Sequence, residues 1–360
     1  MKNVISKLFY ESDNKIIYPL YTLRFILFIF IFVHHCYGNV QISWLRQPAL
    51  AVSGFILLSG FLNGYIYINK KLIIKDSISF TINRIKKFWF LHIIILFIMI
   101  GVSGIFNSTD FAGLFSYFKK IFCNAFLIQS WVNDKDYYFS FNGATWFLSS
   151  YLFLCLITIP VINILRNINN KRHKNIILFL IGVILYLITF IIVYLANKNK
   201  IDTEFWLYIF PPARIFEYII GMIFGIIFRN NKLDFKFDKL IFSIIEILSI
   251  IVLILSVYFN NINNTQVLNG RLNMWIIPVL LIITSFSYQK GIISKLFRIK
   301  IGVYLGKISM YLYIIHQPLI IFVTKTAGYQ IHYRYFALYI LILTIIIGSI
   351  INKFYELKAK

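Results

Sequence analysis

Ten apolar stretches, each close to the length that crosses a bilayer as a helix, recur along the whole sequence. A spanning helix needs about 20 predominantly apolar residues. We therefore predict an all-α integral membrane protein, a bundle of about ten transmembrane helices with both termini in the cytoplasm. The predicted spans are Leu20–Tyr37, Pro48–Ile68, Phe88–Phe106, Thr145–Leu165, Ile176–Ala196, Phe205–Phe228, Leu240–Phe259, Asn273–Tyr288, Ile308–Lys325 and Tyr335–Ile351.

The composition excludes a soluble protein. Hydrophobic residues make up 59% of the chain, charged residues make up 14%, and the mean hydropathy is +0.77. A soluble domain has about 45–50% apolar residues and about 25% charged residues. The net charge of +23 comes from short basic clusters between apolar stretches rather than from a basic domain. We therefore expect membrane lipid around the protein and no nucleic acid as a partner. The three cysteines are far apart in the sequence, so we predict neither a disulfide framework nor a metal site.

The basic clusters also set the predicted orientation, because cytoplasmic loops carry an excess of Lys and Arg. With the N-terminus in the cytoplasm, 25 of the 36 Lys and Arg residues fall on the cytoplasmic side. We predict a single membrane domain over residues 1–360, with cytoplasmic ends at 1–19 and 352–360, located in the plasma or inner membrane as a multi-pass protein. The apolar segment Phe111–Trp131 is broken by two lysines. If it crossed the membrane, later basic clusters would lie outside, so we predict an amphipathic or re-entrant segment at the outer surface.

Ionisable residues inside predicted spans are candidates for function, because a charged group in a bilayer is costly and usually faces a polar interior. Arg24 and His35 share the first span. Their separation of 11 residues returns to within about 20° of one helix face over a rise of about 16 Å. His34 points about 100° away from His35. The alternative is that the histidines are interfacial residues satisfied by water or loop carbonyls.

Two later spans carry further buried polar groups. Arg214 and Glu217 are spaced to form an ion pair on one helix face, just after two prolines that should break or kink the helix. The pair could be purely structural. His316 lies in the middle of a span, and Tyr311 and Tyr313 place hydroxyl groups near it. The alternative for His316 is a core histidine that bonds to a neighbouring helix.

A basic cluster precedes the third span. Arg84 and Lys87 are three residues apart, on one face of a helix, and Lys86 lies beside them. Such a pair suits phosphate binding. The alternative is the ordinary excess of positive charge on the cytoplasmic side.

These residues resemble, in order along most of the chain, the motifs of the acyltransferase-3 family of membrane O-acyltransferases. Leu23-Arg24 with His35 resembles its first-helix signature. The other matches are Leu58-Ser59-Gly60-Phe61-Leu62, Arg84-Ile-Lys-Lys87 with lysine in place of a second arginine, Trp146-Phe-Leu, Arg214-Ile-Phe-Glu217-Tyr-Ile-Ile-Gly221, Ile308-Ser309-Met-Tyr311-Leu-Tyr313-Ile-Ile-His316-Gln-Pro318, and Phe354-Tyr-Glu356. A glutamate that commonly follows the tryptophan is absent, and Tyr151 occupies the nearest position.

The resemblance implies transfer of an acyl group, most simply acetyl, from cytoplasmic acyl-CoA to a hydroxyl of a cell-envelope or exported glycan or of a lipid-linked sugar. His35 is then the expected general base, and Arg24 is the second expected catalytic residue, which would hold an anionic part of the donor or set the electrostatics of the channel. Arg84, Lys86 and Lys87 are expected to bind the CoA phosphates. Side chains expected to shape the cavity are Ser59, Trp146, Arg214, Glu217, Tyr311 and His316. Many relatives carry an appended extracytoplasmic esterase-like domain. We expect this chain to lack it, so a second transfer step would need a separate extracytoplasmic transferase.

Two other classes of protein compete with this interpretation. A transporter or exporter of a glycan or lipid-linked sugar also explains buried charges and proline-broken helices. It leaves the basic cytoplasmic cluster without a use, and the sequence shows no inverted repeat. A membrane scaffold leaves Arg24, His35 and His316 unexplained.

Overall fold

The computed structural model describes residues 8–13, 16–36, 45–103, 111–231, 238–262, 273–327 and 333–358. Helices dominate these ranges, and the only strand-like pairing within them is an isolated bridge between Phe9 and Ile299. The α-helices are α2 (Pro19–His35), α3 (Pro48–Tyr67), α4 (Asp76–Ser103), α5 (Phe111–Ala125), α6 (Lys135–Tyr138), α7 (Trp146–Asn169), α8 (Lys174–Lys198), α9 (Ile215–Asn231), α10 (Lys239–Ile262), α11 (Ile276–Ser287), α12 (Ile292–Leu296), α13 (Lys300–Ala327) and α14 (Tyr333–Lys358). Short turns of other helix types are η3 (Gln129–Trp131), η4 (Gly143–Thr145), η5 (Phe205–Ile209) and η6 (Pro211–Arg214).

Within the described ranges, eight helices are long and apolar enough to cross a membrane: α3, α4, α7, α8, α9 together with η6, α10, α13 and α14. Two shorter apolar helices, α2 and α11, bring the total to the predicted ten. The 17 residues of α2 rise about 26 Å and the 12 residues of α11 about 18 Å, against a hydrocarbon core of about 30 Å. The all-α membrane fold is therefore confirmed, with α11 too short to cross the hydrocarbon core unaided.

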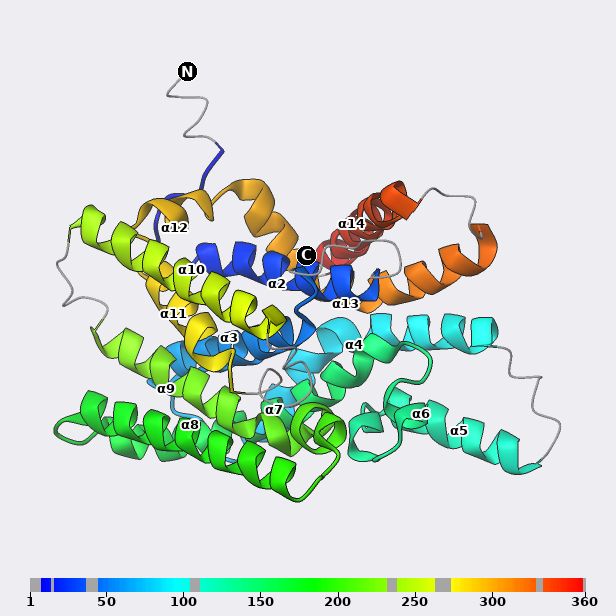
Figure 1. The fold of residues 1–360 in the computed structure, drawn as a ribbon, viewed down its shortest axis with the longest axis horizontal. Coiled ribbons are helices and arrows are strands. Elements are labelled where there is room, and N and C mark those ends of the chain that lie inside the picture. Colours follow the sequence, from blue (N-terminus) through cyan, green and yellow to red (C-terminus); the bar gives the residue numbers. More distant parts are fainter. Residues whose placement is uncertain are drawn as a thin grey trace.

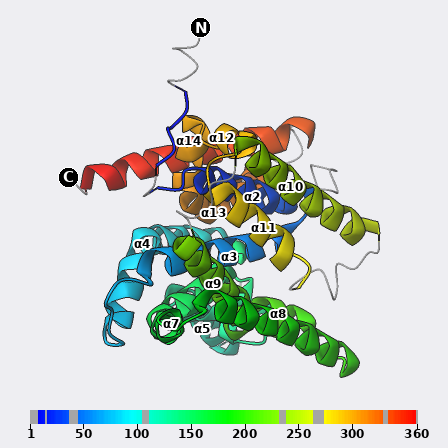
Figure 2. The same cartoon turned by 90° about the vertical axis from the view of Figure 1, so that its left-hand side faces the viewer.

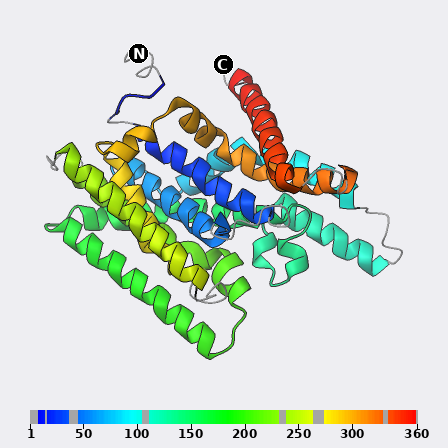
Figure 3. The same cartoon turned by 45° about the horizontal axis from the view of Figure 1, so that its top comes forward.

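The helices sort into an inner and an outer set (Figure 1). α2 and α3 lie at the centre, whereas α8, α10 and α14 lie at the periphery in all three views (Figures 2 and 3). In the apolar 18-residue stretch of α3, 72% of the residues are buried, whereas in that of α8 only 22% are buried. Because the outward faces of the peripheral helices are covered with Ile, Leu and Phe, they suit contact with lipid rather than water.

Four glycines allow α3 and α9 to pack backbone against backbone. A Cβ atom added to Gly60 or Gly64 would lie 2.2 or 2.1 Å from a carbonyl oxygen of α9. Added to Gly221 or Gly225, it would lie 2.4 or 2.0 Å from a carbonyl oxygen of α3. Small residues at such crossings are how helices approach closely inside a membrane. This contact joins the middle of the chain to the N-terminal helices.

Two predicted spans differ most from the structure. The third span begins at Asp76 rather than Phe88, so the basic cluster, which was predicted to be helical but to precede the span, lies within helix α4. The sixth predicted span, Phe205–Phe228, is not one helix, because Pro211 and Pro212 divide it into η5, η6 and α9. The segment Phe111–Trp131 forms the 15-residue α5 followed by η3, and α5 is not among the helices that could span.

Candidate functional site

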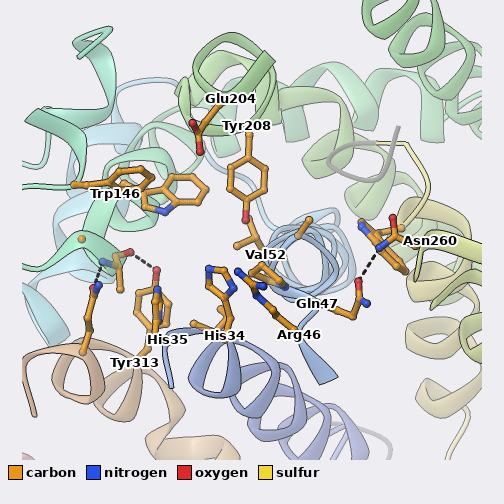
Figure 4. Close-up of a pocket in the computed structure, with 18 residues that line it drawn as sticks. His34, His35, Arg46, Gln47, Val52, Trp146, Glu204, Tyr208, Asn260 and Tyr313 are labelled. Atoms are coloured by element: carbon orange, nitrogen blue, oxygen red, sulfur yellow. Dashed lines mark hydrogen bonds between the residues drawn. The ribbon is translucent and has the colours of Figure 1, made fainter. Parts of the chain in front are cut away.

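A pocket of about 430 Å³ lies where the C-terminal end of α2 meets the N-terminal ends of α3 and α7. We call it the His35 pocket. Figure 4 shows its side chains gathered around one hollow, with His34 and His35 coming from α2. Polar and aromatic groups from several other elements complete the lining, including Arg46, Gln47, Trp146, Glu204, Tyr208, Asn260, Trp275, Tyr313 and Gln317.

A chain of hydrogen bonds fixes the proton positions on the two central imidazoles. Nδ1 of His316 lies 2.7 Å from the backbone carbonyl oxygen of Tyr313. A carbonyl can only accept, so Nδ1 of His316 carries the hydrogen, and Nε2 of the neutral ring is an acceptor. That Nε2 lies 2.8 Å from Nδ1 of His35, so His35 donates through Nδ1. The neutral His35 ring therefore keeps an unprotonated Nε2, which is the atom that a general base needs.

His34 also lines the His35 pocket, but it has different surroundings. Its Nδ1 is buried with no hydrogen-bond partner among the described residues. No neighbouring acceptor therefore sets its tautomer or its orientation through that atom. Of the two adjacent histidines, only His35 is oriented through Nδ1 by a second imidazole.

Three hydrogen bonds hold α13 against the turn before α7. Asn142 donates to the carbonyl of Ile314 at 2.8 Å. The hydroxyl of Tyr313 donates to the carbonyl of Ala144, and the side-chain oxygen of Gln317 accepts from the backbone N–H of Ala144. These bonds fix the position of His316 on α13. Their signal in the sequence was weak: Gln317 follows His316 in its motif, but nothing marks Asn142 or Ala144 as residues that bond to α13.

Arg214 and Glu217 lie behind one wall of the His35 pocket rather than in its lining. Both side chains are fully buried, and Nη1 of Arg214 lies 3.1 Å from Oε2 of Glu217. Ser53 donates to the other carboxylate oxygen at 2.7 Å. The guanidinium faces the ring of Tyr208, 4.6 Å from its centroid, and Nε donates to the Tyr208 carbonyl. The ion pair thus holds Tyr208, a lining residue that the sequence did not single out.

A second pocket, of about 340 Å³, lies toward the opposite end of α2 and contains cations. We call it the cationic pocket. Arg24 of α2 and Arg84 and Lys87 of α4 line it together with Ser59 of α3. No Asp or Glu contributes to its lining within the described ranges. An uncompensated group of cations like this favours an anionic ligand such as phosphate.

The orientation of Arg84 in the cationic pocket is fixed by neutral partners. Its Nη2 donates to the hydroxyl of Tyr67 at 2.9 Å and to the side-chain oxygen of Asn63 at 3.3 Å. Neither partner neutralises the guanidinium. Tyr151 of α7 also lines this pocket and carries no negative charge to neutralise it. The full positive charge therefore stays available to a bound anion.

Two residues singled out from the sequence lie away from both pockets. Lys86 and Lys87 are both exposed on α4, but only Lys87, which is three residues from Arg84 on one face of the helix, lines the cationic pocket; Lys86 lines neither pocket. Tyr311 stacks on Tyr355 of α14, with ring centroids 5.5 Å apart and planes 9° from parallel. Tyr313, two positions along α13, is the tyrosine that reaches the His35 pocket.

The structure thus defines a multi-pass membrane protein with a histidine pocket and a cationic pocket at opposite ends of one central helix. The family model described as an acyltransferase domain matches residues 19–353, so the chain belongs to this acyltransferase family. It is similar to proteins named "Putative O-acetyltransferase" in Staphylococcus aureus strains COL, MSSA476 and MRSA252. Each is 26% identical over 322 residues, covering 84% of this chain and 50% of the relative. The chain spans about half the length of these curated relatives. No solved structure gives a significant match.

Proposed function

We propose that the protein is an O-acyltransferase that moves an acyl group, most simply acetyl, from acyl-CoA to a hydroxyl of a cell-envelope or exported glycan. The observation that carries this proposal is the hydrogen-bonded chain from His35 through His316 to the Tyr313 carbonyl, from which we infer an unprotonated Nε2 on His35. Family membership and the names of the relatives agree with it.

The chemistry assigned to His35 is acyl transfer by general base catalysis. Nε2 of His35 takes the proton of the acceptor hydroxyl as its oxygen attacks the thioester carbonyl carbon. The carbon–sulfur bond then breaks, the new ester stays on the acceptor, and the thiolate of CoA takes the proton from His35. While His35 is an imidazolium, its Nδ1–H still donates to His316, so the charged form keeps its partner.

The cationic pocket is the proposed site for the phosphates of acyl-CoA. Arg24, Arg84 and Lys87 supply three positive charges, and a planar guanidinium suits bidentate binding of phosphate. We place this pocket on the cytoplasmic side, in agreement with the excess of basic residues predicted there. The His35 pocket then opens toward the outer side, where Trp146, Tyr208 and Trp275 offer rings to a sugar.

The test of this proposal is release of free CoA thiol by the purified full chain, with acetyl-CoA and a candidate glycan acceptor. His35→Ala should reduce acceptor-dependent thiol release by about 10²–10⁴-fold, the usual contribution of a general base. His34→Ala is the matched control, because it removes an adjacent imidazole that lacks the bond to His316, and it should retain most of the activity. If His34→Ala were inactive and His35→Ala active, the assignment of the base would be wrong.

A further inference from the structure

An apolar layer separates the His35 pocket from the cationic pocket. Three helices, α2, α3 and α7, each contribute lining residues to both pockets, separated by five to seven positions along the helix. At 1.5 Å per residue, the layer between them is about 8–11 Å thick. The pairs, with the His35-pocket residue first, are Ile31 and Arg24 on α2, Val52 and Ser59 on α3, and Trp146 and Tyr151 on α7.

Between the members of each pair, the same region of the helix carries large apolar side chains. Leu27 and Phe28 of α2 are 2% and 0% exposed, and Phe147 of α7 is 4% exposed. Phe55 of α3 packs against this buried core. The linings of the two pockets are therefore separated by a packed, mainly apolar segment that contains no charged residue on these three helices.

Phe147 occupies the centre of this segment. Its ring centroid lies 5.8 Å from that of Tyr313, which lines the His35 pocket, and 6.4 Å from that of Tyr151, which lines the cationic pocket. A third contact, at 6.1 Å, joins it to Phe55 across the α3–α7 interface. Phe147 is thus one side chain in ring contact with the walls of both pockets.

We propose that Phe147 is the gate between the two pockets and controls which donors reach His35. This inference rests on the proposed function, since it takes acyl-CoA to be bound through its phosphates in the cationic pocket. From there, the thioester reaches Nε2 of His35 only if the apolar layer opens. Leu27, Phe28 and Phe147 are all buried, but Phe147 is the one of the three whose ring contacts both a tyrosine of the His35 pocket and a tyrosine of the cationic pocket. Rotation of the Phe147 side chain would remove the contact that bridges the two walls.

The test compares two acetyl donors on the purified full chain. Acetyl-CoA must pass the apolar layer from the cationic pocket. S-acetyl-N-acetylcysteamine, a short thioester with no nucleotide, can enter the His35 pocket directly. We expect Phe147→Trp, which adds bulk to the packed layer, to lower transfer from acetyl-CoA by about tenfold or more. Transfer from the short thioester should change by less than about twofold. Phe147→Ala should keep both activities, because the smaller side chain leaves the passage open.

Phe286→Trp is the matched control, because Phe286 of α11 is 1% exposed and lines neither pocket. It should not discriminate between the two donors. Three results would each overturn the gate. The first is an equal loss of transfer from both donors in Phe147→Trp, and the second is the same discrimination between donors in Phe286→Trp. The third is a loss of transfer from acetyl-CoA in Phe147→Ala. A wild-type protein that uses neither donor would refute the proposed function itself, so the two failures are distinguishable.

Discussion

His316 is the residue whose substitution tests the hydrogen-bonded chain most directly. In His316→Ala, Nδ1–H of His35 loses its acceptor, and the imidazole is free to rotate and to adopt the other tautomer. A neutral hydrogen bond contributes about 0.5–1.5 kcal/mol net, which corresponds to a factor of about 2–12 in rate. Misorientation adds to this loss, so we expect kcat to fall by about tenfold or more, with the KM for acyl-CoA unchanged because the cationic pocket is intact.

His316→Gln separates positioning from a merely structural role. The side-chain oxygen of glutamine lies as many bonds from Cβ as Nε2 of histidine does, so it can accept the Nδ1–H of His35 in place of His316. Unlike histidine, glutamine cannot take up a proton near neutral pH. We therefore expect kcat of His316→Gln to be within about threefold of wild type, because glutamine restores the hydrogen bond to His35 that the alanine variant lacks. The assay is steady-state thiol release with each variant shown to be monodisperse. Equal defects in the Gln and Ala variants would refute positioning and indicate that His316 itself must accept a proton.

Two further predictions concern the cationic pocket and the packing of the helices. Replacing Arg84 and Lys87 together with glutamine should raise the KM for acyl-CoA by about tenfold or more, because charge-assisted hydrogen bonds contribute about 1.5–3 kcal/mol each. Lys86→Gln, on the same helix but outside the pocket, should leave it unchanged; an equal effect of Lys86→Gln would favour general surface charge. Gly225→Val should sharply lower the yield of folded protein, since its Cβ would lie 2.0 Å from a backbone oxygen. Gly101→Val, with no heavy atom within 4 Å, should be tolerated, and equal yields of the two variants would contradict the close helix crossing.

The membrane fold was predictable because its main signal is local. Length and apolarity of each stretch identify a spanning helix without knowledge of its neighbours. The same signal fails at the ends of helices. α4 begins 12 residues before the predicted apolar stretch does. Hydropathy does not mark this start, because polar residues can also form the backbone N–H to C=O hydrogen bonds of a helix. The break before α9 was foreseeable from Pro211 and Pro212, but its division into η5 and η6 depends on packing that hydropathy does not describe.

The candidate site was predictable only along single helices. The 11-residue spacing indicated that Arg24 and His35 share a face of α2, and each lines a pocket on that helix. The bond between His35 and His316 joins residues 281 positions apart, so no spacing rule could predict it. The sequence placed the hydroxyls of both Tyr311 and Tyr313 near His316, and it is Tyr313 that lines the His35 pocket. Spacing alone does not separate the two, because the rotation of α13 is fixed by contacts with α14 and with the turn before α7.

The separation of the two pockets along α2 has an electrostatic consequence for the base. When His35 takes a proton it becomes a cation, and every nearby positive charge opposes that step. At an effective dielectric constant of about 20, a unit charge 4 Å away costs about 4 kcal/mol, whereas one about 16 Å away costs about 1 kcal/mol. The rise between Arg24 and His35 is about 16 Å. Arg46 lines the His35 pocket itself, so this distance reduces only the effect of the cations proposed to bind the donor. Arg24, Arg84 and Lys87 would oppose the proposed proton uptake by His35 far more strongly if they shared its pocket.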